Sequence, residues 1–162
     1  MMRYLSFALL LLAPMLANAT IQKADEVVVY KSKSLMQLKR NGRVLKSYKV
    51  VFGENPRGHK VMQGDERTPE GRYTLDWKNP QSRFYRSIHI SYPNAADKAR
   101  ARRLGVDPGG DIMIHGIKPQ WKGMENYLTK MNWTDGCIAV TNPEMDEIWA
   151  MVDTPTPISI YP

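Results

Sequence analysis

Cysteine is nearly absent from this chain, because Cys137 is the only one among 162 residues. A single thiol excludes an intramolecular disulfide framework, and a domain of about 150 residues, which buries roughly 70% of its surface, does not need one. Histidine is also scarce: His59, His89 and His115 are widely separated and form no His-x-x-x-His pair. The sequence therefore gives no support for a zinc site, and we expect neither a metal nor another cofactor.

Acidic residues are the minority charge. The chain has 16 Asp and Glu against 23 Lys and Arg, which gives a net charge of +7. This excess favours an anionic partner, whether nucleic acid, anionic lipid or a carboxylate-rich polymer, and charge alone does not choose among them. Apolar residues make up 43% and charged residues 24%, values typical of one globular domain.

The one long apolar run lies at the N-terminus. Arg3 precedes an apolar stretch from Leu5 to Leu16, and Ala17-Asn18-Ala19 follows with the small-x-small pattern that a signal peptidase accepts. The stretch is shorter than the roughly 20 apolar residues that a membrane-spanning helix needs. We therefore predict a signal peptide at residues 1–19, one domain at 20–162 and a periplasmic location. The alternative is an uncleaved anchor, which would be the only attachment to a membrane.

The rest of the chain is predicted to be mainly β with short helices, an α+β fold. Glycine and proline interrupt residues 53–71, so this segment is expected to be irregular. Asn41-Gly42 favours a tight hairpin turn between two strands. Strands are predicted at Glu26–Tyr30, Leu35–Lys39, Val44–Val51, Tyr73–Trp77, Ser87–Tyr92, Asp111–His115 and Ile158–Tyr161.

Two helices are predicted. The first runs from Ala95 to Leu104, with Asn94 as its N-cap and Gly105 at its end, and it carries four basic residues. These form either a solvated surface or a binding patch. The second covers Pro143–Val152, where apolar side chains recur at i, i+3, i+4 and i+7.

The chemistry of the chain centres on Cys137. Export makes nucleic acid a poor partner and leaves the lone thiol either buried and inert or reactive. Cys137 directly follows Gly136, in a turn whose backbone N–H groups are suited to receive a developing oxyanion. A free thiol has a pKa of about 8.5, so a nucleophilic cysteine needs a base. His115 ends an apolar strand and is either that base or a structural histidine; we expect His59 to be a solvated loop residue.

These residues carry a resemblance to a known family. His115-Gly116, followed by Thr134-Asp135-Gly136-Cys137, resembles the His-Gly and Ser/Thr-x-Gly-Cys motifs of YkuD-type L,D-transpeptidases. Upstream, residues 64–73 (GDERTPEGRY) resemble another family segment. The segments 82–85, 90–95 and 138–142 are similar to the YafK-like branch. Together the matches extend from about Val27 to the end of the chain.

The resemblance implies a YkuD-like β-sandwich with a mixed sheet. It implies Cys137 as the nucleophile and His115 as the base, with a backbone carbonyl near Gly116 holding the imidazole and Thr134 and Gly136 supporting the loop. Family members attack a carbonyl of a peptidoglycan stem peptide and form a thioester. The acyl group then passes to an amine of another stem or of an outer-membrane lipoprotein. Water as the acceptor would give a carboxypeptidase or an amidase instead.

The substrate-binding side is less defined by the motifs. Asp135 and Ala139 stand where many members carry His and Arg, which puts simple cross-linking in doubt.

The aromatic stretch from Gly116 to Thr134 is predicted to be a loop or lid. The chain is expected to act as a monomer, and a non-catalytic peptidoglycan-binding module is the alternative from another class. Candidate residues for contacts with stem peptides are Arg67, Arg72, Arg83, Arg86, His89 and Trp133.

Overall fold

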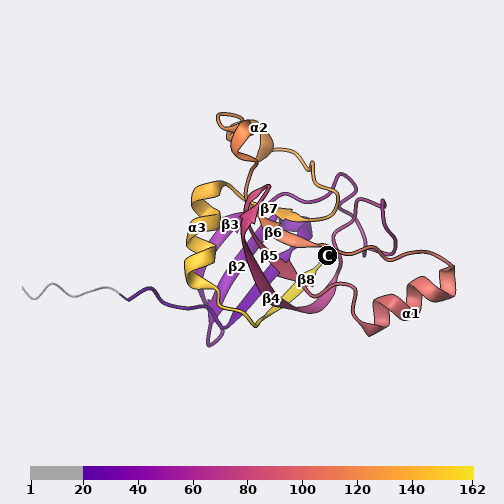
Figure 1. The fold of residues 1–162 in the computed structure, drawn as a ribbon. Helices are drawn as coiled ribbons and strands as arrows, with labels where there is room; N and C mark the ends of the chain where they lie inside the picture. The colour runs from indigo at the N-terminus through magenta and orange to yellow at the C-terminus, as the bar shows by residue number, and fades with distance from the viewer. Residues whose placement is uncertain (1–19) are drawn as a thin grey trace, which may run out of the picture.

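The computed structural model describes residues 20–162, and its centre is one sheet of eight strands (Figure 1). The predicted signal peptide at residues 1–19 lies outside the described residues. The strands are β1 (Glu26–Tyr30), β2 (Leu35–Arg40), β3 (Arg43–Lys49), β4 (Gly71–Ser82), β5 (Tyr85–Ile90), β6 (Met113–His115), β7 (Ile138–Ala139) and β8 (Thr156–Tyr161). Their order is β3-β2-β1-β8-β4-β5-β6-β7, with β1–β8 and β6–β7 parallel and the other pairs antiparallel. The predicted mixed sheet is confirmed.

The sheet curls until its two ends meet. Just beyond β3, Val51 pairs with Ala139 of β7, through N–H···O bonds of 3.2 and 2.9 Å. The curled sheet encloses one hydrophobic core, and each fully buried aliphatic side chain there contributes about 1.5–3 kcal/mol. Core side chains that are wholly inaccessible include Met36, Leu38, Leu75, Ile88, Ile114, Ile138 and Ile158.

The helices are short and lie outside the sheet. They are α1 (Ala95–Leu104), α2 (Glu125–Leu128) and α3 (Asn142–Met151), with 3₁₀ turns η1 (Lys31–Lys33) and η2 (Pro119–Trp121). The bounds predicted for α1 are confirmed, with Asn94 as its N-cap and Gly105 in the left-handed conformation after it. In α3 the predicted apolar stripe faces the core through Met145 and Ile148. Within residues 20–162, no helix is long and apolar enough to span a membrane.

Three expectations about local structure differ from the structure. β4 continues through Pro80 to Ser82 and turns directly into β5. Pro80 is tolerated there because this end of the strand lies beyond its pairing with β8. The two-residue β7 was not predicted, since so short a strand leaves no alternating pattern. The stretch expected to be a loop or lid contains η2 and α2.

The irregular segment 53–71 is held by buried charges rather than by a sheet. Lys31 Nζ donates to the carbonyl oxygens of Gly58 (2.6 Å) and Thr68 (3.0 Å) and to a carboxylate oxygen of Glu70 (2.9 Å). His59, expected to be solvated, is instead engaged. Its Nδ1 accepts from the Glu70 N–H at 2.9 Å, so its Nε2–H donates to Asp97 at 2.9 Å. These bonds fix the segment beside the functional site.

Candidate active site

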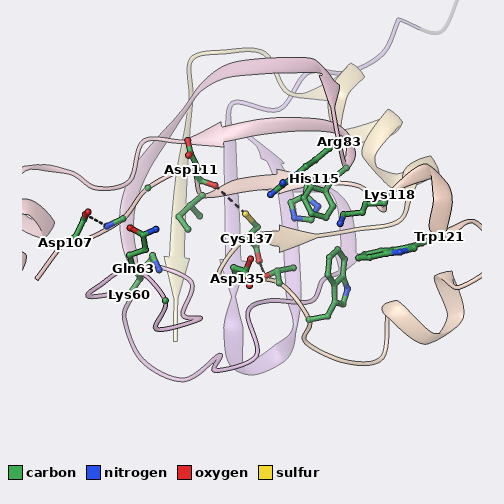
Figure 2. Close-up of a pocket in the computed structure, with 17 residues that line it drawn as sticks. Lys60, Gln63, Arg83, Asp107, Asp111, His115, Lys118, Trp121, Asp135 and Cys137 are labelled. Atoms are coloured by element: carbon green, nitrogen blue, oxygen red, sulfur yellow. Dashed lines mark hydrogen bonds between the residues drawn. The ribbon is translucent and has the colours of Figure 1, made fainter.

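Cys137 and His115 line the same pocket, which has a volume of about 760 Å³. They are 22 positions apart in the sequence but adjacent in the sheet, because Ile114 of β6 pairs with Ile138 of β7. Both isoleucines point into the core, and side chains alternate along strands. His115 and Cys137 therefore point away from the core, on one face. Figure 2 shows both side chains projecting into the pocket.

The imidazole of His115 is buried and has one nitrogen engaged. Nδ1 lies 2.6 Å from the carbonyl oxygen of Gly116 and donates its proton there, which leaves Nε2 unprotonated and able to accept. The ring packs on Phe84, with centroids 4.4 Å apart and planes 28° apart. Burial, together with the positive charge of Arg83, lowers the pKa of His115 to about 4. At neutral pH the imidazole is therefore uncharged and a proton acceptor.

Two glycines and an asparagine hold the segments on either side of the pair. A Cβ at Gly116 would collide with the side-chain oxygen of Asn142. That oxygen accepts the N–H of Ile117 at 2.7 Å and so fixes the chain directly after His115. Gly136 has φ = 121°, and a Cβ there would lie 2.6 Å from the Arg67 carbonyl oxygen. The glycines of the His-Gly and Gly-Cys pairs are thus required by close approaches, to a side chain at Gly116 and to the backbone at Gly136.

The turn that carries Cys137 is tied by two threonine hydroxyls. Thr134 Oγ1 donates to the Cys137 carbonyl oxygen at 2.8 Å and accepts the Gly136 N–H at 3.2 Å. Thr68, which is fully buried, donates to the Gly136 carbonyl oxygen at 2.8 Å. Thr68 and Asn142 were not predicted as individual site residues, although both lie within segments that resemble the family.

The thiol of Cys137 rests in a neutral state. Its Sγ accepts the Met113 N–H at 3.4 Å, and the S–H donates to the Asp111 carbonyl oxygen at 3.5 Å. Burial raises the pKa of the thiol to about 11, the Met113 N–H opposes this, and the carboxylates of Asp135 and Asp111 raise it further. With a neutral imidazole nearby, the resting pair is a thiol and an imidazole rather than an ion pair.

One wall of the pocket, called here the aromatic wall, consists of Arg83, Phe84, Lys118, Trp121 and Trp133. Lys118 Nζ lies 4.5 Å from the Trp121 ring centroid and 5.0 Å from that of Phe84. Trp121 and Trp133 meet edge to face at 5.5 Å. The wall thus offers cations over aromatic rings, a surface suited to a carboxylate attached to an apolar chain.

The opposite wall, called here the acidic wall, consists of Lys60, Gln63, Asp107, Asp111 and Asp135. Lys60 is buried and bound to Asp65 at 2.9 Å. Within residues 20–162, neither Asp111 nor Asp135 forms an ion pair. Among the same residues, no group of His, Cys, Asp and Glu side chains could hold a metal ion. The wall beside the thiol is therefore negative, and the wall beside the imidazole is positive.

The structure brings only part of the candidate binding set to this pocket. Arg83 and Trp133 line it, whereas Arg67, Arg86 and His89 do not. Arg86 pairs with Asp146 at 3.0 Å, on the α3 side. His89 lies 2.6 Å from Asp76 and stacks on Trp77.

Arg67 and Ala139 act near the site through the backbone. The Arg67 carbonyl oxygen packs against Gly136, and Ala139 closes the sheet onto Val51. Arg72, the remaining candidate, lines a separate shallow groove with Arg100.

Comparison with known structures places this fold among the L,D-transpeptidases. Pgp2, the helical cell shape determining protein of Campylobacter jejuni, superposes with a TM-score of 0.65 at 24% identity, covering 89% of this chain and 51% of Pgp2. The L,D-transpeptidase LdtMt1 in complex with imipenem superposes with a TM-score of 0.53 at 16% identity, covering 83% of this chain and 57% of LdtMt1. These likenesses establish the fold.

The sequence comparisons establish the family. Residues 24–160 match the YkuD family, the L,D-transpeptidase catalytic domain, and the chain belongs to that family. YafK of Escherichia coli (strain K12) is 33% identical over 129 residues, which cover 74% of this chain and 45% of YafK. The resemblance noted in the sequence is thus confirmed. The chain spans about half the length of the relatives it matches.

Proposed function

We propose that this chain is an exported L,D-transpeptidase that acts on peptidoglycan stem peptides through a thioester on Cys137. The observation that carries the proposal is the shared pocket of Cys137 and His115, with Nδ1 of the imidazole bound to Gly116 and Nε2 left as the acceptor. Membership of the YkuD family supplies the reaction class. The N-terminal sequence pattern supports a periplasmic location.

In the first half of the reaction, the stem peptide acylates the cysteine. His115 Nε2 takes the thiol proton, and Sγ attacks the carbonyl carbon of the third stem residue. The oxyanion is received by the N–H of Cys137, because the N–H of Gly136 already donates to Thr134. When the C–N bond breaks, the proton on His115 passes to the departing amine of D-alanine. The thioester remains on Cys137.

In the second half, an acceptor takes the acyl group from sulfur. An amine of a second stem peptide, or of a lipoprotein lysine, attacks the thioester carbonyl and gives its proton to His115. The C–S bond then breaks, and the departing thiolate takes the proton from the imidazole. The aromatic wall, with Arg83 and Lys118, suits the stem carboxylates on one side of the thioester.

Because both groups rest neutral, proton transfer and attack are coupled. A thiol with a pKa of about 11 and an imidazole with a pKa of about 4 do not exchange a proton on their own at neutral pH. The substrate carbonyl must be in place to absorb the negative charge as it forms. This arrangement protects the lone thiol from unproductive oxidation, since the thiolate is the reactive species.

Product analysis tests the proposal. Purified protein is incubated with a disaccharide-tetrapeptide, and the products are separated and weighed by mass spectrometry. Transfer predicts new dimers together with free D-alanine, whereas hydrolysis would give tripeptides without dimers. Cys137→Ala should give neither product. If wild-type protein binds the muropeptide but changes nothing, the chain is a binding module and the proposal fails.

A further inference from the structure

The exposed charged side chains of helix α1 are all positive. Lys98, Arg100, Arg102 and Arg103 are exposed. The only acidic side chain of the helix, Asp97, is 5% exposed and turned inward. The helix therefore has no carboxylate of its own on the surface to neutralise the four cations.

The charge of Asp97 is used inside the protein. One carboxylate oxygen accepts the Tyr73 hydroxyl at 2.9 Å and the Asn94 N–H at 3.0 Å, and the other lies 2.9 Å from His59 Nε2. Arg100, 3.9 Å away, is the one helix cation near it. By contrast, on β3 the exposed Lys46 is paired with Glu147 at 3.4 Å. The four cations of α1 are thus gathered on one helix whose only carboxylate is buried.

The helix is joined rigidly to the pocket. Figure 1 shows α1 projecting from the body on the side away from α3. The chain that leaves it, residues 105–111, continues into the acidic wall. The Val106 N–H donates to the Ala101 carbonyl at 3.1 Å, and the Asp107 carbonyl accepts the Gln63 N–H at 2.8 Å. The Tyr92 hydroxyl donates to the Pro108 carbonyl at 2.9 Å. Consequently the cations stand at a fixed position relative to Cys137.

The positive surface extends from the helix onto the sheet. Arg100 and Arg72 of β4 line one shallow groove, together with Glu70 and Tyr161. Arginine forks suit carboxylates, and a row of them suits a polymer whose carboxylates recur along its length. A second point of attachment raises the effective concentration of such a polymer at the pocket.

We infer that α1 is a second binding surface for polymeric peptidoglycan: it contacts the carboxylates of neighbouring stem peptides while one stem occupies the pocket. This inference rests on the proposed function, because it takes the same polymer as substrate. The surface acts by attraction between charges and contributes nothing to the chemical step. Its effect is therefore confined to polymeric substrate and weakens as salt screens the charges.

The test compares two substrates in two variants. K98Q/R102Q/R103Q removes three charges from α1, and K33Q/R43Q/K49Q removes three from the η1–β3 region as a matched control. Turnover is measured on intact sacculi and on a soluble disaccharide-tetrapeptide. We expect the ratio of sacculus to soluble turnover to fall about tenfold in the α1 variant, through KM, and to stay at the wild-type value in the control. Cosedimentation with sacculi in a Cys137→Ala background should weaken in parallel, and only at low salt.

Each other outcome overturns the inference. An unchanged ratio in the α1 variant shows that the helix is a solvated surface, and an equal fall in the control shows that net charge alone matters. Vesicles of anionic phospholipid serve as a third substrate surface. If wild-type protein binds these through α1 but does not sediment with sacculi, the partner is a membrane. A wild-type protein that fails to turn over the soluble muropeptide contradicts the proposed function instead, independently of α1.

Discussion

The surroundings of His115 and Cys137 differ in nearly every respect. His115 stands at the end of a regular strand, beneath Phe84 and Trp133, with positive charge nearby. Cys137 stands on a glycine turn tied by hydroxyl groups, next to Asp111 and Asp135. The positive side disfavours the imidazolium ion, and the negative side disfavours the thiolate. Each environment keeps its group neutral until substrate arrives.

This difference shows how one pocket keeps a thiol and an imidazole in their neutral, less reactive forms. A thiolate beside an imidazolium would be more reactive at rest, and also more readily oxidised. Here, burial disfavours the charged form of both groups. The positive aromatic wall further disfavours the imidazolium ion, and the negative acidic wall further disfavours the thiolate. Changes that alter one side alone should therefore shift the properties of one partner and leave the other as it is.

The largest effect is expected from removing the base. His115→Ala should lower kcat by about 10²–10⁴, because it removes the neutral imidazole that shares the pocket with the thiol. The measurement is muropeptide turnover, with circular dichroism to show that the protein is folded. His89→Ala is the matched control, since His89 lies outside the pocket beside Asp76. Equal losses in both variants would contradict the assignment.

The next largest effect concerns the turn under the thiol. Thr68→Val keeps the shape of the side chain but removes the hydroxyl that donates to the Gly136 carbonyl oxygen. We expect a loss of about 1–2 kcal/mol in unfolding free energy and a fall in kcat of about tenfold, because the thiol is no longer held in place. Urea unfolding and kinetics on the same samples check this. Thr68→Ser should restore both, and a loss of stability with kcat unchanged would leave Thr68 a structural residue only.

A change in the aromatic wall should move the pH dependence of the base. Since burial holds the pKa of His115 at about 4, wild-type kcat/KM should show its acid limb near that pH. Phe84→Ala admits water, which raises the pKa toward its ordinary value and moves the acid limb upward, so activity near pH 5 falls. Phe84→Leu keeps the ring covered and should behave as wild type. An acid limb that stays in place in Phe84→Ala would show that Phe84 does not control the pKa.

The smallest effect is expected from the acidic wall. Asp135→Asn removes a negative charge beside Sγ, which lowers the pKa of the thiol. The rate of alkylation by iodoacetamide at pH 8 should therefore increase roughly two- to fivefold. Asp153→Asn, the same change at an exposed residue paired with Lys23, should leave the rate as in the wild type. A slower reaction in Asp135→Asn would reverse the sign of the argument.

Much of the fold follows from local sequence signals. The bounds of α1 follow from Asn94 and Gly105, because a cap and a left-handed glycine act on adjacent backbone groups alone. The bounds of β7 do not, since its two residues pair with β6 and with Val51, which are distant in the sequence. The length of β4 was also predicted too short. A proline ends most strands, whereas Pro80 is tolerated here because it lies beyond the pairing with β8.

The site divides in the same way. The local sequence left His115 as either a base or a structural histidine, and the resemblance to the family motifs is what singled out Cys137 and His115. The structure places both in one pocket. Thr68 could not be predicted, since its hydroxyl acts on a carbonyl 68 positions away. Nor could the sequence separate Arg83, which reaches the pocket, from Arg86, which turns to Asp146. That choice depends on the hairpin between β4 and β5.

The rate at which a carbapenem acylates the protein tests the pairing of Cys137 with His115 most directly. Ring opening releases no group, so intact-mass spectrometry should show an increase equal to one whole imipenem molecule, mapped by peptide analysis to Cys137. Acylation should be about 100-fold slower or more in His115→Ala. An adduct on another residue, no adduct at all, or an equal rate in His115→Ala would contradict the account.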